Sequence, residues 1–250
     1  MKAYIGTSGW QYKHWNKRFF PEDLPRIKQL WYLSRKFDTV ELNTTFYHFA
    51  RSDTFLKWAN EVPSRFVFSV KMNRLFTHFK RLKLDVKTKR DLHVFLGQTA
   101  LLGNKLGPVL IQLPPSFKAD IGLLAAFIKQ LTIEAKKLRV AFKFAIEFRH
   151  ETWFTSAVYT LLKKEKIALV ITNSPHWPFV IMKTAPFVYI RFHGRSELFA
   201  SNYTNKELRE WAEKLRALKS RTIYAYFNND ANAYAAENAM YLQKLFESKA

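Results

Sequence analysis

Short apolar runs rich in Val, Ile, Phe and Tyr recur along the whole chain and alternate with longer stretches of helical pattern. This alternation predicts repeated strand–helix units and a parallel sheet. Several of the runs are apolar at successive positions, which is typical of strands covered on both faces. We therefore expect eight strands, at residues 3–6, 39–43, 66–71, 109–113, 144–148, 168–172, 187–192 and 222–227.

Polar residues mark where the intervening helices begin. Thr204 and Glu207 have the spacing of a capping box, in which each side chain accepts a hydrogen bond from the other residue's backbone N–H. Ser52 is expected to open a second helix, and Asp230 to cap a last one over residues 231–245.

Eight strand–helix pairs in 250 residues match the usual size of a (β/α)8 TIM barrel, an α/β fold. A doubly wound open sheet is the competing architecture. No glycine-rich phosphate-binding motif follows any of the strands, which removes the common nucleotide-binding versions of that competitor. No linker or change in composition divides the chain, so we expect a single barrel domain over residues 1–250.

The charge balance points to an anionic partner. Lys and Arg number 41 against 20 Asp and Glu, a formal net charge of +21. The absence of cysteine excludes disulfides, thiolate nucleophiles and cysteine-bound metals. The chain shows neither an apolar signal core nor an apolar run near the roughly 18 residues of a membrane span, so we expect a cytoplasmic protein without a membrane partner.

In a TIM barrel the working face is formed by the carboxyl ends of the strands and the loops that follow them. Polar residues gather at these positions in almost every predicted strand unit. They are Thr7, Ser8 and Trp10, then Glu41 and Asn43, Lys71, Gln112, Glu147, Arg149 and His150, Arg191 and His193, and Asn228 and Asn229.

Residues two positions apart in a strand point to the same side, so each of three pairs could line the barrel mouth. The pairs are Glu41 with Asn43, Glu147 with Arg149, and Arg191 with His193. Two interpretations remain open. The charges form either a closed ion-pair network that plugs the barrel or a site that receives a ligand.

Two segments on the expected working face interleave cations with aromatic rings: residues 10–18, which include Tyr12, and residues 71–83. Cations neutralise phosphates and flat rings stack on bases, so this composition is typical of a nucleic-acid groove. The alternative is that the rings pack beneath the loops and the lysines are only solvated.

Several longer motifs resemble the YecE-like family, also called domain of unknown function 72 (DUF72). The resemblance runs nearly from end to end. The motifs lie at residues 6–10, 39–47, 105–117, 147–150, 191–194 and 226–230, and the second of them contains Tyr47.

The family resemblance implies a TIM barrel similar to those of endonuclease IV and xylose isomerase, which is an analogy of fold and not of chemistry. It implies little about activity. The chain departs from the family where Asn173 stands in place of an acidic residue that we expect after the sixth strand, and where Ala231 follows Asp230 without the expected glycine. The first departure weakens a metal site.

The leading hypothesis is a barrel mouth that binds a phosphate-bearing substrate, with nucleic acid preferred, and that performs hydrolase or lyase chemistry if the protein is an enzyme. The predicted catalytic residues are Glu41 or Glu147 as general base, His193 as general acid, and Lys71. The predicted substrate-binding residues are Thr7, Ser8, Trp10, Tyr12, Asn43, Tyr47, Gln112, Arg149, His150, Arg191, Asn228 and Asn229.

Alternatives remain open. No cofactor is expected, although Glu41, Glu147 and His193 are ligand types of hydrolytic metal centres and could recruit Asp230. Lys71 could instead be a Schiff-base nucleophile in an isomerase or aldolase acting on a sugar phosphate. A non-catalytic nucleic-acid-binding protein could use the same basic face. The oligomeric state is not indicated by the sequence.

Overall fold

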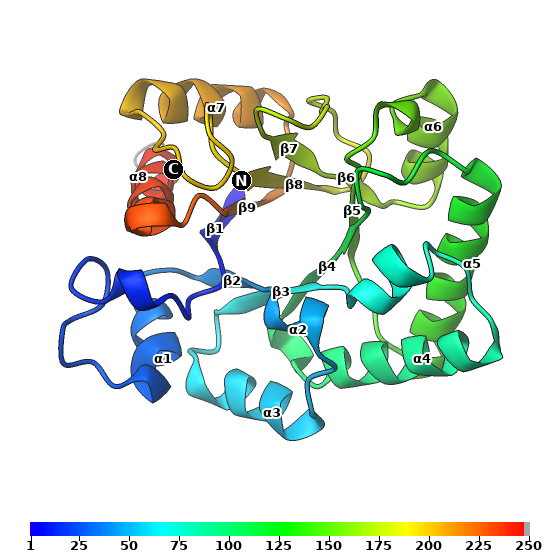
Figure 1. Ribbon diagram of the computed structural model, residues 1–250, viewed down its shortest axis with the longest axis horizontal. Helices are drawn as coiled ribbons and strands as arrows, with labels where there is room; N and C mark the ends of the chain where they lie inside the picture. The colour runs from blue at the N-terminus through cyan, green and yellow to red at the C-terminus, as the bar shows by residue number, and fades with distance from the viewer. Residues whose placement is uncertain (248–250) are drawn as a thin grey trace.

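A ring of parallel strands lies at the centre of the computed structural model, which describes residues 1–247 (Figure 1). The last three residues of the expected domain 1–250 lie outside this range. The strands are β1 (Lys2–Ser8), β2 (Thr39–Leu42), β3 (Val67–Lys71), β4 (Leu106–Gln112), β5 (Phe144–Glu147), β6 (Ala168–Leu169), β7 (Ile171–Asn173), β8 (Phe187–Phe192) and β9 (Thr222–Phe227).

The longer helices surround this ring on its outside (Figure 1). Within the described part of the chain, no helix has the length and apolar character needed to cross a membrane. The α-helices are α1 (Gln29–Leu33), α2 (Thr44–Tyr47), α3 (Ser52–Glu61), α4 (Val86–Ala100), α5 (Ile121–Leu138), α6 (Ser156–Lys164), α7 (Asn205–Ala217) and α8 (Tyr234–Glu247), and a π-helical turn spans Leu75–Phe79.

Two of the three predicted helix starts are confirmed. α7 begins with the capping box of Thr204 and Glu207, and α3 begins at Ser52. The prediction for Asp230 was wrong, because its side chain caps no helix. The chain forms a short 3₁₀ turn after Asp230, and Asn232 then adopts a left-handed φ of 57° before α8 begins.

The sheet order β6-β5-β4-β3-β2-β1-β9-β8-β7 builds the predicted barrel. Its two end strands are separated in the sequence only by Val170, so the ring is nearly closed. The predicted strand 168–172 is therefore two strands, since its first half pairs with β5 and its second half with β8.

β4 begins earlier than the sequence predicted, at Leu106 rather than residue 109. Pro108 cannot donate a ladder hydrogen bond, and the pairing with β3 shifts register beside it. Gly107 permits the close approach that follows, because a Cβ atom there would lie 2.9 Å from the carbonyl oxygen of Phe68.

Alternation along the strands separates two packed layers. Outward-facing residues such as Ile190 and Phe192 belong to the large core beneath the helices. Inward-facing residues such as Phe187, Tyr189 and Tyr226 fill the barrel itself. The inner layer contains hydroxyl groups that need partners, and the Tyr226 hydroxyl lies 2.7 Å from Ser69 Oγ. This inner layer, with its paired hydroxyl groups, lies below the candidate site.

A matched pair of glycine substitutions tests the strand packing. Gly6→Ala is expected to destabilise the protein, because the new Cβ atom would lie 2.2 Å from the Thr39 carbonyl oxygen. Gly97→Ala lies within α4, and its nearest atom would be at 3.7 Å. We expect it to stabilise the protein by up to about 1 kcal/mol. Chemical denaturation measures both, and equal effects would contradict the β1–β2 packing.

Candidate functional site

Arg191 is the centre of a buried ion-pair group inside the barrel. Its Nη2 donates to Glu41 Oε2 and its Nη1 to Glu147 Oε2, each at 2.8 Å. The three side chains are at most 1% exposed. They come from β8, β2 and β5, so one guanidinium joins strands on different sides of the ring.

The remaining carboxylate lone pairs are also used. The strand register places Ser8 beside Glu41, and its hydroxyl donates to Oε2 at 2.9 Å. Tyr189 donates to Glu41 Oε1 at 2.7 Å, and Arg149 Nε donates to Glu147 Oε1 at 2.7 Å. Every carboxylate oxygen of the group therefore accepts at least one hydrogen bond.

The group is electrostatically self-consistent. Burial disfavours the Arg191 cation, but Glu41 and Glu147 outweigh that effect and raise the pKa of Arg191. Burial would likewise raise the pKa of Glu147, yet Arg149 and Arg191 hold it well below its usual range. Arg191 therefore remains a cation and Glu147 a carboxylate near neutral pH.

His193 is fully buried beside this group. Burial and the nearby Arg191 charge lower its pKa to about 4, so the imidazole is neutral at pH 7. Its Nδ1 lies 3.2 Å from Asn228 Nδ2, and its ring meets the edge of Trp177 with the centroids 5.1 Å apart. A neutral, enclosed imidazole has no proton to donate as an imidazolium.

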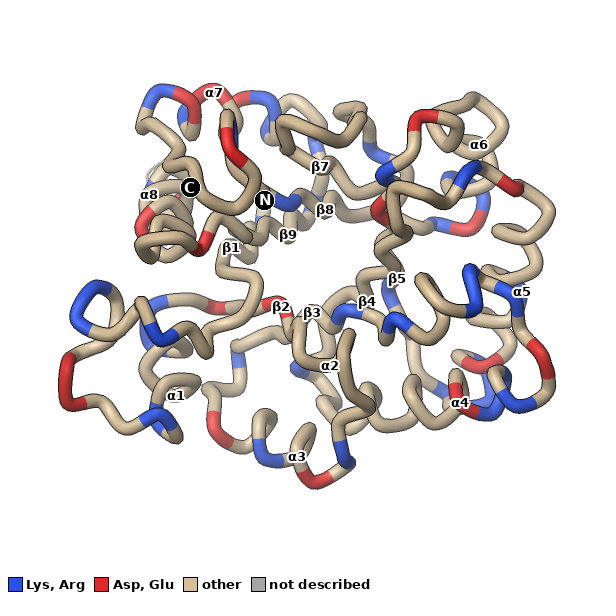
Figure 2. Tube along the Cα trace, in the orientation of Figure 1, with Lys and Arg blue, Asp and Glu red and all other residues tan. Residues whose placement is uncertain are grey.

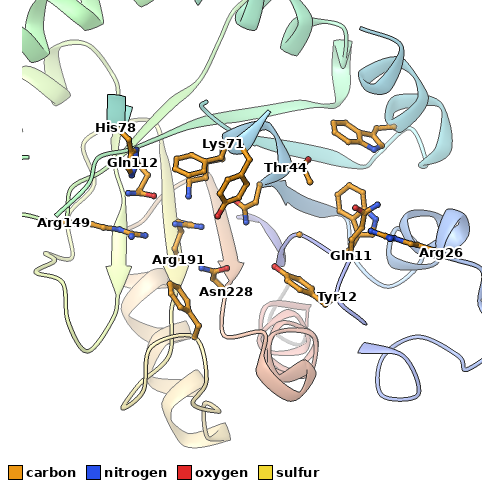
Figure 3. A pocket seen from close by; sticks show the side chains of 17 residues that line it. Gln11, Tyr12, Arg26, Thr44, Lys71, His78, Gln112, Arg149, Arg191 and Asn228 are labelled. Carbon is orange, nitrogen blue, oxygen red and sulfur yellow. The ribbon is translucent and has the colours of Figure 1, made fainter. Parts of the chain in front are cut away.

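Above the ion-pair group lies a cavity of about 530 Å³ at the carboxyl ends of the strands. Figure 3 shows Lys71, Arg149 and Arg191 gathered at one side of it, with Gln11, Tyr12 and Arg26 at the other. Its lining residues are Gly9, Trp10, Gln11, Tyr12, Arg26, Asn43, Thr44, Phe46, Tyr47, Trp58, Lys71, His78, Gln112, Arg149, Arg191, Phe199 and Asn228.

Lys71 differs from Arg149 and Arg191 because it has no carboxylate partner among residues 1–247. Among residues 1–247 its ammonium makes no hydrogen bond or ion pair, and it lies 4.0 Å from the centroid of the Phe46 ring. Burial, together with the charges of Arg191 and Arg149, lowers the Lys71 pKa to about 7. A substantial fraction of this side chain is therefore a free amine near neutral pH.

His78 contacts the same aromatic ring. Its imidazole meets Phe46 edge-on, with the centroids 4.9 Å apart. Burial and the charge of Lys71 lower the His78 pKa to about 4, so it is a neutral acid–base group. Its Nδ1 lies 2.9 Å from the Thr77 hydroxyl.

The structure divides the sequence-predicted site residues into three sets. Nine line the cavity, four lie at or next to the buried ion-pair group, and three make local hydrogen bonds elsewhere. The first set is Trp10, Tyr12, Asn43, Tyr47, Lys71, Gln112, Arg149, Arg191 and Asn228; the second is Ser8, Glu41, Glu147 and His193; the third is Thr7, His150 and Asn229.

Each residue of the third set has a local role. Thr7 donates to the carbonyl of Gly9, and His150 accepts from the backbone N–H of Thr152. Asn229 is fully buried and donates to the carbonyl of Ser201. None of the three lines the cavity.

The sequence prediction missed several lining residues. Phe46 and His78 lie within segments that had been singled out, and only their roles went unnoticed. Arg26 begins a short 3₁₀ turn and Phe199 lies in a loop, and no sequence signal links either of them to a strand end. The missed residues are Gly9, Gln11, Arg26, Thr44, Phe46, Trp58, His78 and Phe199.

The two segments that interleave cations with aromatic rings bury most of those rings. Trp15 and Phe76 are 0% exposed, and the Trp15 indole donates to the Asp230 carbonyl. Phe79 is exposed, at 66%. Lys and Arg also occur around the whole periphery (Figure 2), so the excess charge is not confined to the mouth.

The described residues do not bring together the ligands that the metal-site alternative needs. Among residues 1–247, no three His, Asp or Glu side chains converge as metal ligands. Glu41 and Glu147 each direct one oxygen at Arg191 instead.

Glu147→Gln tests the ion-pair group. We expect a loss of about 3–5 kcal/mol in the free energy of unfolding near pH 7, because Arg149 and Arg191 lose a buried counter-charge. The folded-state pKa of Glu147 is depressed, so its contribution is present above its unfolded pKa near 4.5 and is lost as the pH falls below it. Urea denaturation at pH 7 and pH 4 measures both effects.

The matched control for Glu147→Gln is Asp53→Asn, whose carboxylate pairs with Arg51 in full solvent. We expect no measurable change there. Equal stability of the two variants at pH 7 would contradict a structural role for the buried group.

Lys71→Met is expected to raise the melting temperature at pH 6, because it removes a poorly solvated charge. The unfolded chain binds more protons than the folded one between pH 7 and 10.5, so the penalty is full below pH 7 and fades as the pH rises. The gain should therefore shrink at pH 9. Thermal unfolding with Lys83→Met as an exposed control checks this, and a lower melting temperature at both pH values would show that Lys71 stabilises the fold.

Comparison with known proteins identifies the family to which this chain belongs. Residues 4–250 match the family described as Protein of unknown function DUF72. UPF0759 protein YunF of Bacillus subtilis is 25% identical over 277 residues, which cover 98% of this chain and 94% of YunF. A D-psicose 3-epimerase structure, at 9% identity and a TM-score of 0.58 over 99% of each chain, shares the fold alone.

The crystal structure of a DUF72 family protein from Thermotoga maritima superposes with a TM-score of 0.83 at 26% identity, covering 99% of this chain and 100% of that one. The family match spans nearly all of the sequence, as the sequence motifs had predicted. The chain belongs to the DUF72 family of uncharacterised TIM-barrel proteins.

Proposed function

We propose that the barrel mouth binds a phosphate-bearing substrate, with nucleic acid preferred over a small sugar phosphate. One observation carries this proposal: the charged residues of the lining are Arg26, Lys71, Arg149 and Arg191, and no Asp or Glu among residues 1–247 lines the cavity. A pocket that presents only cations to its occupant favours an anion.

The arginines still have donors to offer. Arg149 uses its Nε for Glu147, and its terminal nitrogens make no hydrogen bond within residues 1–247. Its guanidinium is held 3.5 Å from the centroid of the Trp177 ring, which fixes its plane. The buried Arg191 Nε also has no partner in the described chain. Such planar, oriented donors suit phosphate oxygens.

The rim of the cavity supports the preference for nucleic acid. Tyr47 lines the cavity and is 56% exposed, while Phe79 is 66% exposed. The Arg74 guanidinium lies over both rings, 5.5 Å from the centroid of Tyr47 and 5.2 Å from that of Phe79. Exposed rings beside a cation are the groups on which unpaired bases stack.

The chemistry that follows binding belongs to the same proposal. Hydrolase or lyase activity needs an acid–base group or nucleophile at the cavity, and His78 and Lys71 both line it. Glu41 and Glu147 position Arg191 from beneath, so they serve as positioning residues here. We also propose a cytoplasmic location, where nucleic acid is present. A purely binding protein would use the same cations and leave the bound strand unchanged.

Binding measurements with three probes test the proposal: inorganic phosphate, ribose 5-phosphate and a single-stranded oligonucleotide. We expect all three to bind, the oligonucleotide most tightly and with a steep salt dependence. Arg149→Gln should weaken phosphate binding at least about tenfold, since a hydrogen bond to a charged group contributes roughly 1.5–3 kcal/mol.

The matched control is Arg221→Gln, which removes an exposed cation just before β9, at the opposite end of the barrel. It should bind phosphate as the parent protein does. If both substitutions weakened phosphate binding equally, the effect of Arg149→Gln would be explained by net charge alone. Absence of phosphate binding in the parent protein would overturn the proposal.

A further inference from the structure

We infer that Lys71 is a nucleophilic amine that forms an imine with an aldehyde or ketone carbonyl of a phosphate-bearing substrate. This inference deepens the proposed function, on which its phosphate requirement rests. It names the class of substrate, a phosphorylated carbonyl compound, and the atom that attacks it, Lys71 Nζ.

The position of Lys71 is that of a reactive group and not of a structural one. It is the last residue of β3 and lines the cavity, where it is partly exposed. The two carboxylates that could neutralise it are both bound to Arg191. Its ammonium instead lies 4.0 Å from the centroid of the Phe46 ring.

The surroundings of Lys71 favour the free amine. Arg149 and Arg191 are cations in the same cavity, and their charges, together with burial, lower its pKa to about 7. A desolvated lysine next to other cations is a recognised way to make an amine nucleophilic at neutral pH. The same arginines would hold the substrate phosphate, and so bring its carbonyl carbon near Nζ.

The proposed step balances without an oxidant or a reductant. The Lys71 nitrogen lone pair forms a bond to the carbonyl carbon, and the π electrons of the carbonyl pass to its oxygen, which takes up a proton. The resulting carbinolamine loses that oxygen as water and becomes a protonated imine. His78 lines the same cavity, contacts the Phe46 ring and is neutral, so it is placed to move the protons of these transfers.

Two sources can supply this chemistry: a small phosphosugar aldehyde, or a nucleic-acid strand that has lost a base and carries an aldehyde between phosphates. Glyceraldehyde 3-phosphate and an oligonucleotide with one abasic site are the two probes. Glyceraldehyde without phosphate is the third. Each is incubated with the protein at pH 7.5, reduced with cyanoborohydride and analysed by intact mass and peptide mapping.

We expect one adduct, on the peptide that contains Lys71, formed at least about tenfold faster than on any exposed lysine because most lysines are protonated at this pH. The rate should rise with pH to a plateau above about 7. Lys71→Arg, which keeps the charge, should abolish the adduct, whereas Lys83→Arg should leave it. The phosphorylated probe that labels Lys71 faster identifies the source of the carbonyl compound.

The outcomes separate this inference from the proposed function. Adducts spread over exposed lysines, or an unchanged adduct in Lys71→Arg, would overturn the inference even if phosphate binds. Equal labelling of Lys71 by glyceraldehyde and glyceraldehyde 3-phosphate would overturn the phosphate requirement and retain the reactive amine.

Discussion

The pairing of Arg191 with both Glu41 and Glu147 is the interaction on which the rest of the site depends. Two carboxylates buried in the barrel would be strongly destabilising without a counter-charge of suitable geometry. Arg191 supplies one at 2.8 Å to each. Because both carboxylates already accept hydrogen bonds from Arg191, neither is free to form an ion pair with Lys71. The cationic mouth is thus a consequence of the ion-pair group beneath it.

Most of the fold could be predicted from the sequence because strands buried on both faces appear as continuous apolar runs. The strands 187–192 and 222–227 have the predicted bounds, and each of the other runs overlaps a strand of the ring. The errors share a physical cause. The division at Val170 and the early start of β4 depend on pairing with neighbouring strands, which no local pattern records.

The candidate site was less predictable than the fold. Its ion-pair group and its cavity lining lie only about two residues apart along a strand. Glu41 lies in β2 and Asn43 directly after it, yet the first is buried in the ion-pair group and the second lines the cavity. Alternation predicts their common side but not their depth. Arg26 is still harder to predict, because only the tertiary fold brings its loop to the cavity.

The strand-end charges lie at two depths, and each depth fits one of the two interpretations. A closed ion-pair group lies inside the barrel, as a plug would, while Lys71 and Arg149, whose terminal nitrogens make no hydrogen bond within residues 1–247, line the cavity above it. A plug alone would have no reason to place an uncompensated lysine at its upper surface, since that charge is disfavoured in the folded state. An arrangement that tolerates this penalty is typical of sites whose electrostatics are completed by a ligand. The unpartnered amine of Lys71 therefore favours a functional role, and the hydrogen-bonded carboxylates of Glu41 and Glu147 favour a stabilising one.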